Sequence, residues 1–217
     1  MKDKKGTIKR IVKNNKMVTG AAIVLCATIV LYLLFGSMTG IVVDAETGKP
    51  IEGAVIAVKW TVTKGMPGLT YGLDYKISEA VTDKAGKFRI WGPLNPLVNP
   101  PIVVVYKRGY VAWLSYGIFP GNEAREDFRW TRGYKFRLDR YNIKYSHDKH
   151  ISFFSVLFSS DLAPRLHKAY QWEEPLARKE RYLFGEKAEK HPNGYASEEI
   201  WDEVVNELYL QAGDKLK

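Results

Sequence analysis

Residues 79–91 read EAVTDKAGKFRIW, and this stretch decides the expected fold. Asp83 opens a turn and Gly86 can take a positive φ, which is the pattern of a tight hairpin between two strands. In the second strand Phe88 and Ile90 alternate with basic residues. Such alternation buries one face of a strand and leaves the other in water. The stretch therefore predicts antiparallel β-structure with one buried face.

Short apolar segments of the same kind recur on both sides of this hairpin. Each is bounded by turn residues, and they cover 41–43, 54–60, 102–106 and 134–138. Residues 64–73 read instead as a glycine-rich loop. Short strands at this spacing are typical of a β-sandwich, so we expect about seven strands within residues 38–145.

The formal net charge of +9 is concentrated at the N-terminus. Residues 1–16 hold seven basic side chains and one acid, which leaves 26 of the 33 basic and 23 of the 24 acidic residues beyond them. A nearly neutral body lacks the cationic surface that binding to a nucleic-acid backbone requires. We therefore expect no nucleic acid among the partners.

Residues 17–35 carry no charged side chain. A helix of that length, at about 1.5 Å per residue, comes close to the roughly 30 Å of a bilayer core. Basic residues precede this run and Asp44 and Glu46 follow it, which favours a signal anchor over 17–37 with residues 1–16 in the cytoplasm. The expected localisation is a single-pass plasma-membrane protein whose main domain lies in the periplasm or at the cell surface. A cleaved secretory signal is the alternative.

Cys26 is the only cysteine of the chain. An intrachain disulfide and a thiolate metal site are therefore impossible. Leu25 stands where a lipidated cysteine would follow a small residue, so we do not expect a lipoprotein.

Four blocks follow one another through the predicted sandwich. They read GIVVD at 40–44, TGKPIEGA at 47–54, TD at 82–83 with GKF at 86–88, and YKRGY at 106–110. In this order they resemble the carboxypeptidase regulatory-like domain of the transthyretin-like superfamily, over residues 38 to about 115. The resemblance implies a mainly β fold, a seven-stranded Greek-key sandwich.

The resemblance does not extend to the enzymes related to that domain. The His-x-x-Glu ligand pair of zinc carboxypeptidases is missing, because none of the four histidines has a glutamate three residues later. The chain ends GDKLK, not in the Tyr-Arg-Gly-Ser signature of the hydroxyisourate hydrolases. We therefore expect no enzyme, no catalytic residue and no cofactor.

A metal site is the next possibility. His147 and His150 fall at a spacing that places two imidazoles on one helical face, and Asp161 or His167 would have to supply a third ligand. Histidines at a polar junction between strands and helices are more often solvated or hydrogen-bonding groups. The sequence therefore predicts no metal.

Aromatic side chains are dense between residues 106 and 130. Trp113, Tyr116 and Phe119 are candidates for an exposed surface that stacks a sugar or a peptide, and packing in the core or against C-terminal helices is the alternative.

Residues 146–217 are expected to form a helical extension. Acidic pairs at 173–174 and 198–199 precede or open helical stretches, where they interact favourably with the helix dipole. In the last helix an apolar stripe contains Trp201, Val205 and Leu208. We expect this stripe to pack on the sandwich, and docking of a partner protein is the alternative.

These observations predict a non-catalytic, membrane-anchored extracytoplasmic module with a structural or protein-interaction role, whose partner is another membrane or extracytoplasmic protein. One alternative is a carbohydrate- or peptide-binding module, which exposed coplanar aromatic rings would favour. Another is an accessory subunit or cryptic metal-dependent hydrolase, which two histidines converging with a carboxylate in a pocket would favour.

Overall fold

The computed structural model describes residues 18–30, 36–121, 123–126, 128–155, 158, 161–190 and 198–210. The strands are β1 (Ser37–Asp44), β2 (Val55–Met66), β3 (Leu69–Val81), β4 (Lys87–Trp91), β5 (Ile102–Tyr106), β6 (Trp113–Leu114), β7 (Gly117–Ile118), β8 (Glu123–Ala124) and β9 (Tyr134–Leu138). The helices are α2 (His147–Ser155), α3 (Pro164–Tyr170), α4 (Glu174–Lys190) and α5 (Glu198–Val205), a π-helical turn η2 (Asn206–Leu210) and a helix over 18–30.

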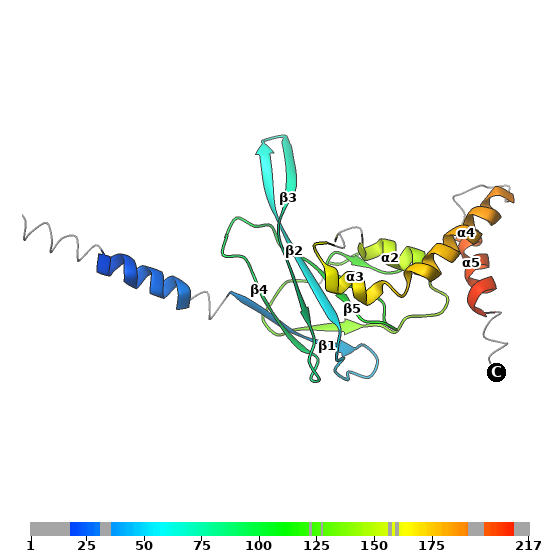
Figure 1. Cartoon of the computed structure of the whole chain (residues 1–217), viewed down its shortest axis with the longest axis horizontal. Coiled ribbons are helices and arrows are strands. Elements are labelled where there is room, and N and C mark those ends of the chain that lie inside the picture. The colour runs from blue at the N-terminus through cyan, green and yellow to red at the C-terminus, as the bar shows by residue number, and fades with distance from the viewer. Residues whose placement is uncertain are drawn as a thin grey trace, which may run out of the picture.

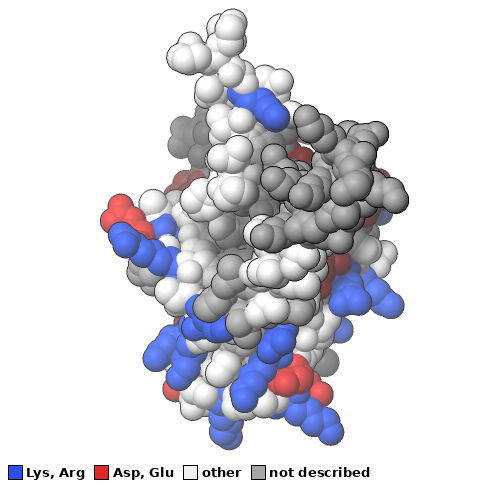
Figure 2. All heavy atoms as spheres, turned by 90° about the vertical axis from the view of Figure 1, so that its left-hand side faces the viewer, with Lys and Arg blue, Asp and Glu red and all other residues white. Residues whose placement is uncertain are grey.

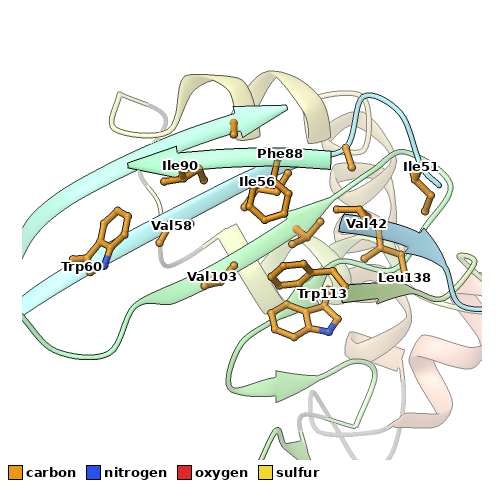
Figure 3. Packing of buried hydrophobic residues seen from close by; sticks show 14 residues of the cluster. Val42, Ile51, Ile56, Val58, Trp60, Phe88, Ile90, Val103, Trp113 and Leu138 are labelled. Carbon is orange, nitrogen blue, oxygen red and sulfur yellow. The ribbon is translucent and has the colours of Figure 1, made fainter. Parts of the chain in front are cut away.

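The strands form two sheets that face each other. In the smaller sheet β1 lies between β4, to which it is antiparallel, and β9, to which it is parallel. The larger sheet is antiparallel, in the order β3-β2-β5-β6-β7-β8. Side chains from both sheets fill the space between them (Figure 3). Phe88 and Ile90 of β4 are among them, as their alternation with exposed basic residues predicted.

A glycine allows the closest approach in this core. A Cβ on Gly40 of β1 would lie 2.7 Å from the Phe88 ring and 2.9 Å from the Phe136 ring. Only glycine therefore lets both rings pack directly on the β1 backbone.

Helices α2 and α3 cover the other face of the larger sheet (Figure 1). Ala57 of β2 and Val104 of β5 point to this side and pack with Phe154 of α2 and Leu166 of α3. Strands β2 and β5 are therefore buried on both faces, which explains why residues 102–106 are apolar without alternation.

The last helix packs on another helix. Ile200 and Val204 of α5 are fully buried in a cluster with Ala188 of α4, and Phe184 and Leu208 pack at its edge. The apolar stripe thus packs against α4. The expectation that it packs on the sheets is wrong. A stripe of this width is buried equally well against a second amphipathic helix.

The predicted fold class, a mainly β seven-stranded sandwich, is wrong as well. The described residues form sheets of three and six strands, and helix and strand take about equal shares. Part of the difference lies at 64–73, where the predicted loop is instead the end of a long β2–β3 hairpin. The turn between the strands is Pro67-Gly68, and Gly68 has a φ of 89°, so two residues suffice where a loop was expected.

The predicted anchor over 17–37 is contradicted by the helices that the structure describes. Among them, none combines the length and the apolar character needed to cross a membrane. The part of this helix that the structure describes, residues 18–30, spans about 20 Å at 1.5 Å per residue, against about 30 Å of bilayer core. The predicted transmembrane helix is therefore wrong, and so is the single-pass plasma-membrane localisation that depended on it. Residues 1–17 and 31–35, which hold the predicted cytoplasmic tail and parts of the anchor, lie outside the described residues.

Candidate functional site

A groove runs along the side of the molecule where α2 and α5 meet. It consists of three adjoining hollows that share lining residues, one with a volume of about 600 Å³ and two of about 230 Å³ each. Its walls come from three parts of the chain, namely residues 119–121, residues 144–153 and α5 with its continuation at Asn206. Another shallow hollow, of about 470 Å³, lies over β1 and β4 and holds none of the predicted interaction residues.

Three of the six predicted interaction residues line this groove. They are Phe119, which follows β7, and Trp201 and Val205, which lie one turn apart on α5. The other three lie elsewhere. Trp113 is buried in the core between the sheets, Leu208 packs on α4, and Tyr116 is exposed without lining the groove.

Trp201 is held from two sides. Its ring stacks on Phe184 of α4, with centroids 4.3 Å apart and planes at 24°. The ammonium group of Lys149 lies 5.4 Å from the centre of the same ring and also pairs with Glu198, at 2.6 Å. A cation over an indole ring and an ion pair together join α2 to α5 across the groove. The indole is therefore a fixed part of the wall.

Phe119 sits on the opposite wall, on the sheet side. Its ring makes edge contacts with Tyr145 and with His150 of α2, at centroid distances of 5.3 and 5.1 Å. It also contacts Phe153, at 5.6 Å. Phe119 thus links the groove surface to a polar network buried beneath α2.

Helix α2 lies between this network and the groove, and its residues alternate between the two sides at helical spacing. His147, His150 and Phe154 recur at helical spacing and are buried, whereas Lys149 and Ser152 lie between them in sequence and line the groove. One face of the helix therefore faces the protein interior and the other faces the groove.

The network centres on Glu173, which is 1% exposed. Its Oε2 lies 2.9 Å from Nδ1 of His147 and 2.9 Å from Nδ1 of His150. Its Oε1 accepts a hydrogen bond from the hydroxyl of Tyr106, which itself accepts one from Nε1 of Trp172 at 2.8 Å. A buried carboxylate with three donors is a satisfied group.

The tautomer of His150 follows from its partners. The backbone N–H of Ala112 donates to Nε2 of His150 at 2.8 Å, so Nε2 must be the acceptor. Nδ1 therefore carries the hydrogen and donates it to Glu173. Both ring nitrogens are thus occupied by bonds within the protein.

A second buried carboxylate, Glu180 of α4, holds the start of α2. It accepts the backbone N–H groups of His147 and Asp148, at 3.0 and 2.9 Å, and the hydroxyl of Ser146 at 2.7 Å. The hydroxyl of Tyr209 donates to it as well, at 3.0 Å. The first N–H groups of a helix lack partners within it, and a carboxylate placed there also favours the positive end of the helix dipole. Glu180 thereby fixes α2 to α4.

Burial and hydrogen bonding set the acidity of these groups. Burial acts to raise the pKa of Glu173, but the hydrogen bonds from His147 and His150 outweigh it and hold the pKa at about 2. Burial, reinforced by the charge of Glu173, raises the pKa of Tyr106 and of Tyr141 far above the ordinary value. Glu173 is therefore a carboxylate at neutral pH, and both phenols are neutral.

The arrangement of His147 and His150 differs from the metal site that their spacing suggested. The two rings do converge, but on Glu173 instead of Asp161 or His167, and His167 pairs with Glu174 at 3.2 Å. Within the described residues no group of three or more His, Cys, Asp or Glu side chains could hold a metal ion. Glu173, His147 and His150 also do not line any of the hollows described above.

Comparisons with known proteins add no family. No family model matches the chain, and no curated protein matches it. A weak likeness is found to the crystal structure of a 9R-lipoxygenase from Cyanothece PCC8801, with 17% identity and a TM-score of 0.26 over 69% of this chain and 26% of that enzyme. A likeness this weak carries no argument about fold or activity. The resemblance to the carboxypeptidase regulatory-like domain thus gains no support.

Sequence reasoning missed the network that supports the groove. Glu173 and Glu180 stand in a charged helical segment where acids are normally solvated, and Tyr106 was read as part of an apolar strand. The one available signal was the pair His147 and His150 at helical spacing. It indicated that two imidazoles share a face, but the group that they face lies 23 or more residues away.

Proposed function

We propose that this chain is a non-catalytic protein-interaction module that binds an extended segment of a partner protein in the groove between α2 and α5. The observation that carries the proposal is the convergence of Phe119, which follows β7, with Trp201 and Val205 of α5 on one groove. Aromatic anchors in a hollow with a polar rim are typical of protein-binding surfaces.

The charges of the groove indicate what kind of segment fits. Lys144 lies on the α2 side and Asp202 on the α5 side, and both line the two smaller hollows. Neither makes an ion pair with another residue in the part of the chain that the structure describes. The expected ligand therefore carries an apolar or aromatic side chain for Phe119, with an acidic and a basic residue close by.

Two observations weigh against the alternatives. A sugar-binding surface needs a free aromatic face, yet Trp201 is covered by Phe184 on one side and lies against Lys149. A hydrolase needs accessible groups, yet Glu173 and His150 are buried and their bonding atoms are already engaged. These arguments favour binding of a peptide segment over both.

The proposal is tested by placing a photo-crosslinking amino acid at Phe119 of the full chain, in the cells that produce it. The matched control carries the same group at Tyr182 of α4, an aromatic residue that is 72% exposed and lies outside the groove. We expect a discrete crosslinked protein from position 119 that is absent from position 182. The substitution Asp202→Lys, at an exposed position, should weaken that product. Identical products from both positions, or a product unaffected by Asp202→Lys, would contradict the proposal. A crosslinked glycan in place of a protein would favour the carbohydrate alternative.

A further inference from the structure

The β2–β3 hairpin extends well beyond the sheet to which it belongs (Figure 1). Pairing between β2 and β5 ends at Lys59, and a register shift between Trp60 and Thr61 follows immediately. From Thr61 to Asp74 the two strands form ladder pairs only with each other, and neither has a further strand on its outer edge; Asn99 bonds to the backbone oxygen of Thr61 at the base. We call residues 61–74 the arm.

The register of the arm sorts its side chains onto two faces. Directly paired residues share a face, and the successive pairs of one face are Val62 with Leu73, Lys64 with Tyr71, and Met66 with Leu69. The pairs of the opposite face are Thr61 with Asp74, Thr63 with Gly72, and Gly65 with Thr70. The arm therefore has one apolar face, with Lys64 as its only charged residue, and one polar face.

The rest of the protein forms hydrogen bonds to the polar face of the arm and leaves the apolar face uncovered. On the polar side, Thr61 and Thr63 bond to the side chain of Asn99, at 2.9 and 3.1 Å. On the apolar side, Met66, Leu69 and Tyr71 are 73%, 79% and 59% exposed. Figure 2 shows that the protruding part at the top of the molecule carries few charged side chains. Alternation of this kind is the pattern of a strand whose apolar face is buried, and here nothing in the described chain buries it.

We propose that the apolar face of the arm packs against the same face of a second copy of this chain. The area is sufficient. An aromatic side chain buries about 150 to 250 Å² when fully covered, so the partly exposed apolar residues of one arm offer on the order of 500 Å². Two facing arms then bury on the order of 1,000 Å², which is the lower limit for a specific interface.

The chemistry of the face favours a copy over a foreign protein. The face carries no acid, and the stem of Lys64 can lie along its apolar neighbours while the ammonium group reaches water. It therefore presents no charge pattern that would select a different partner. A second arm offers three apolar rungs at the same spacing, and two ribbons can stack face to face at about 10 Å. Because each chain has one such arm, a twofold pairing closes as a dimer.

The test compares two neighbouring positions on opposite faces of the arm. Tyr71→Asp places a charge in the centre of the apolar face, and Thr70→Asp places the same charge on the polar face. Sedimentation velocity of the full chain over a wide concentration range gives the dimer dissociation constant. We expect a dimer for the unchanged chain and for Thr70→Asp. For Tyr71→Asp the dissociation constant should rise at least about 100-fold, because a carboxylate would be buried where the aromatic ring packs in the interface.

A second measurement excludes loss of folding as the cause. In a Cys26→Ser background, Tyr71→Cys should form a disulfide-linked dimer under mild oxidation, whereas Thr70→Cys should not. Circular dichroism should be the same for all variants, because the arm lies outside the core. The helix over 18–30 also exposes apolar side chains such as Ile23 and Val24, and a dimer formed there would not respond to Tyr71→Asp. A monomeric unchanged chain, or a dimer with equal affinity in both aspartate variants, would overturn the proposal. Because these variants leave the groove intact, this outcome is independent of the crosslinking result at Phe119.

Discussion

Replacing Glu173, in the turn between α3 and α4, should destabilise the protein strongly. In Glu173→Ala three buried donors lose their acceptor at once, those of Tyr106, His147 and His150. An unsatisfied buried polar group costs about 1 to 3 kcal/mol, and three such donors are left here. We therefore expect the free energy of unfolding to fall by at least about 3 kcal/mol.

The isosteric change gives a finer measure. In Glu173→Gln the amide oxygen can still accept from both imidazoles, but the amide nitrogen then faces the hydroxyl of Tyr106, which already accepts a bond from Trp172. One hydrogen bond is lost, so the expected cost is about 1 to 3 kcal/mol.

Urea unfolding of the full chain, followed by near-ultraviolet circular dichroism, measures both values. Glu174→Gln is the matched control, since the adjacent carboxylate is about one third exposed and its ion pair with His167 should contribute about 0 to 1 kcal/mol. If Glu173→Ala costs no more than Glu174→Gln, the central position of Glu173 in the network is refuted.

Two further predictions follow from the same structure. Since the pKa of Glu173 is about 2 in the folded protein and 4.5 is its ordinary value, its contribution of about 3 kcal/mol is complete above pH 4.5 and is lost as the pH falls toward 2. The urea midpoint should therefore drop steeply in that window and less steeply in Glu173→Gln; equal slopes would contradict this assignment. Separately, Gly86→Ala should cost clearly more than Gly48→Ala in thermal unfolding. Both glycines have a φ near 70°, which costs an L-residue about 1 to 2 kcal/mol, but a Cβ at Gly86 would also lie 2.5 Å from the backbone oxygen of Val42 and one at Gly48 meets nothing within 4 Å. Equal losses of melting temperature would show that the contact is relieved without cost.

The groove between α2 and α5 and the arm differ in how far the sequence could predict them. The groove depends on Phe119 and Trp201, which local patterns picked out as aromatic or apolar positions. No local pattern could bring them together, because they meet only after α5 has packed beside α2, where Lys149 lies over the Trp201 ring. The arm could have been predicted, since Leu69, Tyr71 and Leu73 alternate with polar residues and glycine. Its three glycines favoured a loop, whereas only Gly68 lies in the two-residue turn and Gly65 is a paired residue of β2.

Local sequence patterns by themselves determined the strands with one solvent-exposed face, such as Lys87–Trp91, and the helical character of the C-terminal segment. These features depend on interactions between residues a few positions apart, which the period of the sequence records directly. Tertiary structure alone decided that the strands divide into sheets of three and six, that α5 packs on α4, and that Glu173 receives His147, His150 and Tyr106. Each of these outcomes joins segments that are distant in the chain, and the burial that makes a carboxylate a structural centre exists only once those segments have met.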